Sequence, residues 1–289
     1  MESKNIFKIA IIGAGAAGLL CAIEAGKKGH GVTVFDHAKK PGEKIRISGG
    51  GRCNFTNKYC TPENFISDNK HFCKSALSRY PSSSFISMVE EYKIPYHEKN
   101  PHNETGQLFC DGKSQEIIDM LLSECNAANV KIRLETTIEN IESNDPKMTL
   151  FIDGQKHHFD RVVIATGGPS IPKMGASDFG YKTAISFGHN IIDCQPALVP
   201  LTFTDDLLNF TKSLSGLSID SVFIKSDSFS FRDDLLFTHR GLSGPVILQI
   251  SSYWNAGESL TINLLPDLNI KDVLKARNKH KLKQNCQRY

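Results

Sequence analysis

Three glycines in G-x-G-x-x-G spacing and an aspartate that follows them are the first residues in this chain suited to chemistry. Gly13, Gly15 and Gly18 come directly after the short apolar run 8–12. In a dinucleotide-binding turn the first glycine permits the tight turn, the second lets a pyrophosphate approach the backbone, and the third lets a helix pack closely on a strand. Asp36 follows these glycines at about the sequence separation where dinucleotide-binding folds have a carboxylate that accepts hydrogen bonds from ribose hydroxyls. These residues favour dinucleotide binding, with NADP the least favoured ligand because a carboxylate repels a 2′-phosphate.

A strand, a tight turn, a helix and a second strand are needed to position these four residues. The run 8–12 is rich in β-branched residues, as is typical of a buried parallel strand, and 32–35 is a second such run. Apolar residues between them recur on one helical face, so the helix N-terminus at Ala16 and Ala17 would offer free N–H groups to phosphates. A glycine-rich turn without a ligand is the alternative interpretation. The motif alone does not separate FAD from NAD.

A second glycine-rich stretch, 48–51, lies within the sequence GEKIRISGGGRCNFTN, which spans 42–57. Lys44 and Arg46 bring positive charge to it. Consecutive glycines let backbone amides come close to a flat or phosphorylated ligand, but their conformational freedom is equally compatible with a flexible surface loop. Composition alone leaves both interpretations open.

This long stretch, placed just after a βαβ dinucleotide fingerprint, resembles the signature of the BaiN/YhiN-like flavoproteins, also described as aminoacetone-oxidase-family FAD-binding enzymes. The resemblance implies an α/β fold, in which a Rossmann-like FAD-binding domain of the two-dinucleotide-binding type carries an inserted β-rich domain. It also implies that the loop lies along the pyrophosphate and the isoalloxazine of FAD. The cofactor contacts that it implies from the loop are Lys44, Ser48, Gly49, Gly51, Arg52, Cys53 and Asn54.

Two roles are open to Cys53. A thiol beside Arg52 and close to a flavin could have a lowered pKa and act as a redox partner. We favour the interpretation that Cys53 is a small residue packed beside the ring, because no second cysteine is nearby in the sequence.

A third informative stretch begins with the apolar run 162–165, which predicts a buried strand. The run stops at Thr166 and Gly167, where the backbone can approach a ligand closely. By the same resemblance this turn contacts the pyrophosphate side of the cofactor, and the backbone of Ile138 lies beside the adenine. Residues 180–187 are predicted to form a helix.

Residues 58–100 have a mainly helical pattern, with apolar side chains at helix-like separations. We interpret the aromatic positions among them as core rather than as a surface on which bases stack. The apolar positions concerned are Phe65, Phe72, Leu77, Phe85, Met88 and Val89.

A domain boundary is expected near Cys194, with a FAD-binding domain at 1–193 and a β-rich domain at 194–289, because short alternating apolar runs follow this point. Near the end, an apolar helical face at 270–274 gives way to a basic run at 277–288. Members of the resembling family continue well beyond this point and return to the FAD domain, so the chain is expected to be truncated at its C-terminus. A basic tail that binds nucleic acid is the less favoured interpretation.

The composition excludes several function classes. A net charge of +3, with 40% apolar and 22% charged residues, is typical of a globular protein and gives no case for nucleic acid as a partner. No apolar run is long enough to cross a bilayer and no signal-peptide pattern is present, so we expect a cytoplasmic protein without a membrane partner. The eight cysteines include no C-x-x-C pair and no zinc-site spacing, so reduced thiols and no metal are expected.

The resemblance therefore implies a FAD-dependent oxidoreductase that acts on a small organic substrate, with NAD(P)H or oxygen as its redox partner. No residue has the sequence context of a dedicated acid, base or nucleophile, so the catalytic residues stay open, as does the oligomeric state. A non-catalytic remnant with weak or no FAD binding is the alternative from a different class. An NAD-dependent dehydrogenase would explain the glycine motif but not the loop 44–54.

Overall fold

The computed structural model describes residues 5–99 and 105–268 of the chain. The chain divides into two compact units, Met1–Ile191 and Ile192–Tyr289. The division falls two residues before the boundary expected from the sequence. The helical face expected at 270–274 and the basic run at 277–288 lie outside the described residues. None of the described helices is long and apolar enough to cross a membrane.

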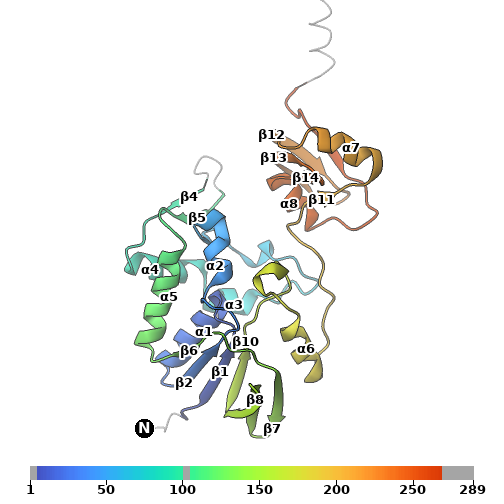
Figure 1. Ribbon diagram of the computed structural model, residues 1–289. Helices are drawn as coiled ribbons and strands as arrows, with labels where there is room; N and C mark the ends of the chain where they lie inside the picture. Colours follow the sequence, from blue (N-terminus) through green and yellow to red (C-terminus); the bar gives the residue numbers. More distant parts are fainter. Residues whose placement is uncertain (1–4, 100–104, 269–289) are drawn as a thin grey trace, which may run out of the picture. The chain divides into compact units, whose positions relative to one another are not determined.

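The first unit is organised around a parallel sheet whose strand order is β10-β1-β2-β6. These strands are β1 (Lys8–Ile12), β2 (Gly31–Phe35), β6 (Lys131–Arg133) and β10 (Arg161–Ile164). Helix α1 (Ala16–Lys27) connects β1 to β2, and α5 (Gln115–Ala127) packs beside α1 on the same face of the sheet (Figure 1). The predicted strand, helix, strand unit is therefore confirmed.

The two faces of this sheet are covered differently. Buried side chains of α1 and α5, among them Leu19, Ile23 and Leu121, form the core on one face. The other face is covered by a three-stranded antiparallel sheet of β7 (Asn140–Asn144), β8 (Lys147–Ile152) and β9 (Gln155–Phe159). There Phe35 and Phe159 meet edge to face, with ring centroids 5.9 Å apart.

One feature of the sheet differs from its sequence pattern. The run 162–165 predicts a buried strand, but β10 lies at the edge of the sheet, and the side chain of Ile164 is 38% exposed. The prediction holds only in part, because Val162 and Val163 are partly buried against the two cores while Ile164 is exposed. The exposed end of β10 contributes to the cleft described below.

The segment between β2 and α5 forms a smaller layer of short elements. Its sheet has the order β3-β5-β4, and Phe85, Met88 and Val89 pack into the main core as predicted. Phe65 and Phe72 were expected in the core but are 48% and 79% exposed, so that expectation is wrong. The elements are α2 (Glu43–Ile47), η1 (Ser48–Gly51), β3 (Asn54–Asn57), η2 (Pro62–Asn64), α3 (Lys74–Arg79), α4 (Ser82–Glu91), β4 (Tyr96–Glu98) and β5 (Gln107–Cys110).

After β10 the first unit ends with η4 (Pro172–Met174) and α6 (Phe179–Ser186). The latter confirms the helix predicted at 180–187 to within one residue at each end.

The second unit is built on an antiparallel sheet with the order β11-β14-β13-β12-β15. Helix α8 packs against β12 and β13, and Val222, Leu235 and Ile247 are fully buried between them. The predominance of antiparallel strands agrees with the β-rich unit expected from the sequence. The elements are β11 (Leu201–Thr202), α7 (Asp205–Ser213), β12 (Ser218–Lys225), β13 (Ser230–Thr238), β14 (Gly241–Ser243), α8 (Pro245–Ser251) and β15 (Thr261–Asn263).

Candidate functional site

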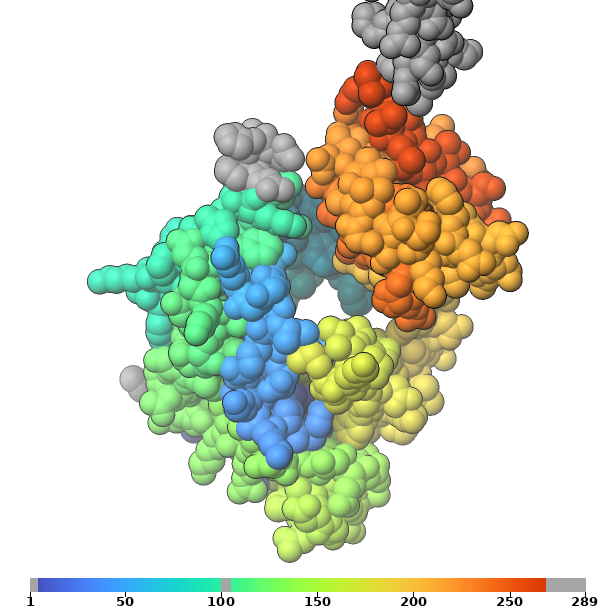
Figure 2. Space-filling model, turned by 45° about the horizontal axis from the view of Figure 1, so that its top comes forward, coloured from blue at the N-terminus to red at the C-terminus, as the bar shows by residue number. Residues whose placement is uncertain are grey.

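The candidate site is a cleft at the carboxyl ends of β1, β2 and β10, the position where open parallel sheets bind ligands. It consists of two neighbouring cavities of about 630 Å³ and about 320 Å³. Five residues line both cavities, so the two adjoin each other. They are Gly13, Asp36, His37, Thr166 and Gly175. Figure 2 shows the blue segment that follows β2 beside the yellow-green segment that follows β10.

The glycines of the first motif differ in why they must be glycine. A Cβ on Gly18 would overlap the carbonyl oxygen of Gly13, and a Cβ on Gly13 would overlap that of Ala165, so both are required by packing within the protein. A Cβ on Gly15 would meet nothing within 4 Å and would project into open space. Gly15 also has an ordinary extended backbone, with φ −84° and ψ −172°. Nothing in the described protein requires a glycine there, which fits a position kept clear for a ligand.

The N-terminus of α1 opens into the same cleft. Gly15 is its N-cap and provides no side-chain cap, and no acidic residue lies in the first turn. Ala16 and Ala17 line the larger cavity. The first N–H groups of a helix carry partial positive charge and have no partner within the helix, so this end can bind a phosphate.

Asp36 already has backbone partners. Its Oδ2 accepts a hydrogen bond from the N–H of Ala14 at 2.6 Å, and its Oδ1 accepts one from Ala38 at 2.8 Å. The carboxylate therefore fixes the glycine-rich turn to the end of β2. Each carboxylate oxygen can accept a further bond, so the ribose contact stays a prediction alongside this structural role.

Lys44 reaches across the cleft from α2. Its Nζ donates to the carbonyl oxygen of Gly168 at 3.3 Å and to Ser170 Oγ at 3.2 Å. The exposed side chain of Lys44 thus links the segment after β2 to the segment after β10. A phosphate entering the cleft would offer the ammonium group a stronger partner than these two neutral oxygens.

The remainder of the loop 44–54 divides into lining residues and supporting residues. Ser48, Cys53 and Asn54 line the larger cavity. The carbonyl oxygens of Gly51 and Arg52 instead accept hydrogen bonds from the N–H groups of Ser114 at 2.8 Å and Cys110 at 3.0 Å, which ties the loop to β5 and α5.

Twelve of the sixteen residues that the sequence nominated line one or both cavities, and four do not. Gly18, Gly49, Gly51 and Arg52 lie outside the lining. Gly49 has φ +59°, and a Cβ there would crowd the ring of Phe109, so its role is in the backbone of the loop. The lining residues are Gly13, Gly15, Ala16, Ala17, Asp36, Lys44, Ser48, Cys53, Asn54, Ile138, Thr166 and Gly167.

The Cys53 side chain is 4% exposed, and burial raises the pKa of its thiol to about 11, with a hydrogen bond to Ser48 opposing the effect. A second thiol lies near it, that of Cys110 on the paired strand β5. Burial raises the pKa of Cys110 to about 12, with a smaller contribution from the interaction with Cys53. Both thiols are protonated near neutral pH. This favours packing over the thiolate redox role for Cys53.

We predict that the buried thiols resist alkylation. Near neutral pH, Cys194, which is exposed, should react with iodoacetamide well before Cys53, Cys110 and Cys125, all buried and all with raised pKa. The pKa values of these thiols are higher in the folded chain than in the unfolded chain, so the unfolded chain releases its thiol protons at lower pH. The free energy of unfolding should therefore fall as pH rises from about 8.5. Peptide mass spectrometry after timed labelling measures the first effect. Labelling of Cys53 as fast as Cys194 would contradict it.

Several lining residues had no signal in the sequence. His37 lines both cavities, and a Cβ on Gly175 would overlap its Nε2, so the imidazole lies directly against the segment after β10. In the sequence, only its position next to Asp36 could have marked His37 as a candidate site residue. Phe55, Phe85 and Leu121 give the larger cavity an apolar end. They come from β3, α4 and α5, which meet only through the tertiary fold.

The arrangement is suited to holding a long, partly phosphorylated ligand rather than a metal. No group of three or more His, Cys, Asp or Glu side chains in the described part of the chain could hold a metal ion. His239 and Arg240 are exposed at the turn between β13 and β14 of the second unit. The residues that line the cleft all belong to the first unit, and redox chemistry there would be that of a bound cofactor.

Comparison with known proteins gives a family match and several relatives. The family model described as HI0933-like protein Rossmann domain matches residues 7–249. The ribosomal RNA dihydrouridine synthase of Escherichia coli is 48% identical over 275 residues, which is 95% of this chain and 68% of that protein. The 3-dehydro-bile acid delta(4,6)-reductase of Clostridium scindens is 25% identical over 286 residues, 94% of this chain and 68% of that protein.

Among solved structures, the open conformation of a flavocytochrome c3 fumarate reductase matches 76% of this chain and 48% of that chain, with 16% identity and a TM-score of 0.47. This chain thus spans about two thirds of the length of each of the two curated relatives and about half of that solved structure.

Proposed function

This chain belongs to the HI0933-like Rossmann-domain family, a FAD-binding family, and from that premise we propose that it is a FAD-dependent reductase of a carbon–carbon double bond conjugated to a carbonyl group. The uracil ring of ribosomal RNA is the substrate that we propose first. A small organic enone is the second candidate, and NAD(P)H is the proposed electron donor.

The names of the relatives support the reaction class. A dihydrouridine is a uridine whose ring double bond, conjugated to a carbonyl, has been saturated, and the name of the bile acid reductase describes double bonds near a 3-keto group. The two named activities share one chemical step, the addition of a hydride and a proton to an electron-poor double bond. We place the RNA substrate first because the ribosomal RNA dihydrouridine synthase is 48% identical over almost the whole chain, whereas the bile acid reductase is 25% identical.

The observation that carries FAD binding is the open space at Gly15 beside an uncapped helix N-terminus. We assign the pyrophosphate to this turn, where Ala16, Ala17 and Thr166 also line the cleft. We assign a ribose to Asp36, and the adenine to the smaller cavity, which Ile138 lines. The apolar end at Phe55 and Phe85 is then the part of the lining that excludes water.

When bound, FAD supplies the hydride that a reductase of this class adds to its substrate. The residues of this chain bind and orient it. Lys44 holds the two loops together across the cleft and offers positive charge, while Asp36 fixes the glycine-rich turn. We assign no residue to proton transfer. The described cleft residues support the binding half of the proposal.

Two linked measurements test the proposal. The first is the visible absorption spectrum of the purified chain after FAD addition and desalting, followed by anaerobic reduction with NADH or NADPH. Flavin bands near-stoichiometric with protein are expected, with bleaching by one of the two donors. A spectrum without flavin bands would favour the non-catalytic remnant, whereas stable yellow protein would exclude the NAD-dependent dehydrogenase.

The second measurement is nucleoside mass spectrometry of unmodified ribosomal RNA after incubation with the flavin-loaded chain and the competent donor. Dihydrouridine formation that depends on both FAD and donor is expected. Turnover of a 3-keto steroid enone without any dihydrouridine would instead put the small organic substrate first. A reduced flavin that is reoxidised by neither would contradict the reductase assignment.

A further inference from the structure

A compact loop in the first unit exposes apolar side chains that its sequence pattern placed in the core. The loop is defined here as residues 62–73. Its ends are in contact, because Cys73 Sγ lies 3.8 Å from the carbonyl oxygen of Pro62, within hydrogen-bonding range. Phe65, Ile66 and Phe72 are 48%, 55% and 79% exposed. Surface loops of this length with their ends together are frequently functional, and clustered exposed apolar groups mark interaction surfaces.

Local hydrogen bonds restrain this loop. The side chain of Asn64 accepts from the N–H of Thr61 at 2.7 Å, and that of Asn69 accepts from the N–H of His71 at 3.1 Å. The backbone N–H of Phe72 donates to the carbonyl oxygen of Asn69 at 2.9 Å. These hydrogen bonds restrain the backbone that carries the phenylalanines, and such restraint lowers the entropy that a partner must overcome on binding.

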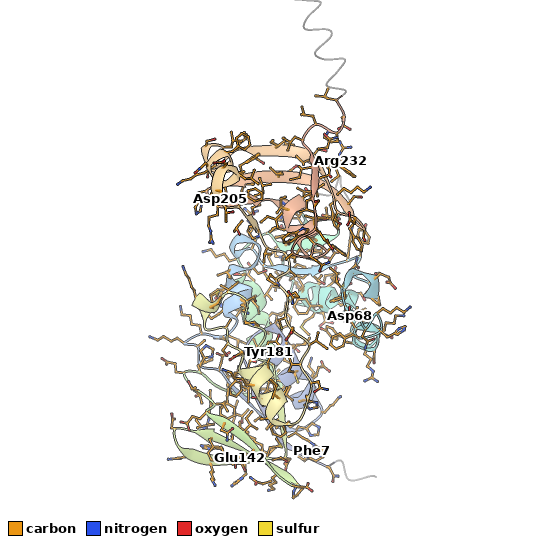
Figure 3. The ribbon with its side chains drawn as sticks, turned by 90° about the vertical axis from the view of Figure 1, so that its right-hand side faces the viewer. Phe7, Asp68, Glu142, Tyr181, Asp205 and Arg232 are labelled. Carbon is orange, nitrogen blue, oxygen red and sulfur yellow. The ribbon has the colours of Figure 1, made fainter. Side chains whose placement is uncertain are left out.

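Two lysines and a histidine lie among these apolar side chains. Lys70 and His71 lie within the loop and Lys74 follows it, and none of the three forms an ion pair with another described residue. The acids of the loop are Glu63 and Asp68. The pKa of Glu63 is lowered mainly by hydrogen bonds to its carboxylate from its own backbone N–H and from the Thr61 side chain, and to a smaller extent by the charge of Lys74. In Figure 3 the labelled Asp68 lies at the edge of the first unit, among side chains that point outward.

We infer that the loop 62–73 is a docking surface for single-stranded RNA, an inference that rests on the RNA substrate of the proposed function. Aromatic side chains that stack on bases, interleaved with cations that contact phosphates, are the recurring design of such surfaces. Phe65 and Phe72 are the stacking groups, and Lys70 and Lys74 are the phosphate contacts. The loop follows β3 along the chain, and Asn54 and Phe55 of β3 line the cleft.

This inference reverses the expectation that nucleic acid is no partner. That expectation came from a net charge of +3 over the whole chain. A small net charge limits long-range steering, but stacking and a few phosphate contacts act locally and need no large basic field.

The test is fluorescence anisotropy of a short, labelled, uridine-rich RNA oligonucleotide with the FAD-loaded chain. Phe72→Ala should weaken binding by about tenfold, while Phe72→Tyr should retain the affinity because it keeps a ring that can stack. Phe210→Ala is the matched control, since Phe210 is a 60% exposed phenylalanine on α7 of the second unit. Lys70→Ala should lower the dependence of affinity on salt by about one released counterion.

Equal RNA affinity for wild type, Phe72→Ala and Phe210→Ala would overturn the inference, as would no RNA binding by a chain that carries FAD. Loss of self-association in Phe72→Ala with unchanged RNA affinity would overturn it in favour of a second copy as the occupant. Flavin absorbance and NAD(P)H-dependent bleaching, measured on the same samples, report on the proposed function separately. Loop-dependent RNA binding without dihydrouridine would leave the surface standing and contradict the reaction.

Discussion

Gly15→Thr is expected to lower the affinity for FAD at least about a hundredfold while leaving the unfolding free energy of the apoprotein within about 0.5 kcal/mol of wild type. The backbone of Gly15 is ordinary and extended, and its Cβ direction meets no protein atom within 4 Å. Threonine and glycine are about equally good N-caps, so α1 gains or loses little. The added side chain instead fills the space beside the helix N-terminus where we place the pyrophosphate. Titration with FAD and urea unfolding without FAD measure the two effects.

Gly18→Ala is the matched contrast for this prediction. Its Cβ would overlap the carbonyl oxygen of Gly13, so α1 and the turn must separate, at a cost of about 2–4 kcal/mol in stability. The two variants therefore separate a glycine that packing requires from a glycine that we propose faces the cofactor. If Gly15→Thr bound FAD normally, the cofactor would not lie at this turn. Equal loss of stability in both variants would contradict the assignment of open space at Gly15.

The parts of the fold and site that the sequence predicted depend on short-range constraints. The close packing of Gly18 on Gly13 lies within one strand, turn and helix, which the apolar periodicity of 8–12 and 32–35 also marks. The same holds for α5 and α6, whose patterns lie within single segments.

Features that depend on the tertiary fold escaped prediction. His37 lies against Gly175, far away in the sequence, and Phe55, Phe85 and Leu121 meet only because β3, α4 and α5 pack together. An apolar pattern shows that a side chain can be buried, but does not show whether a neighbour exists to bury it. The partly exposed Ile164 at the sheet edge and the exposed Phe72 are both cases of this kind.

Asp36, which the sequence nominated for binding, also has a structural role. The sequence assigned it to a ribose, and that contact stays a prediction. The structure adds that its two oxygens accept the N–H groups of Ala14 and Ala38 at 2.6 and 2.8 Å on a side chain that is 16% exposed. Charge-assisted hydrogen bonds of this kind stabilise a fold more than neutral ones do.

Asp36→Asn is therefore expected to lower the unfolding free energy of the apoprotein by about 2 kcal/mol, in addition to weakening FAD binding. An amide keeps one acceptor oxygen and turns its NH2 group toward the other backbone N–H, which leaves that donor without an acceptor. Urea unfolding without cofactor isolates this effect from any contact with FAD. A carboxylate that served the ribose alone would leave apoprotein stability unchanged, and that result would contradict the structural role.

Asp160→Asn is the control for this last prediction. Asp160 also accepts a backbone N–H at the end of a strand, from Lys8 at 2.7 Å, but with a single oxygen, so an asparagine can retain the bond. It also lies outside both cavities. We expect Asp160→Asn to change stability by less than about 1 kcal/mol and to leave FAD affinity unchanged. Loss of stability confined to Asp36→Asn would identify the doubly bonded carboxylate as the group that holds the glycine-rich turn in its binding conformation before the cofactor arrives.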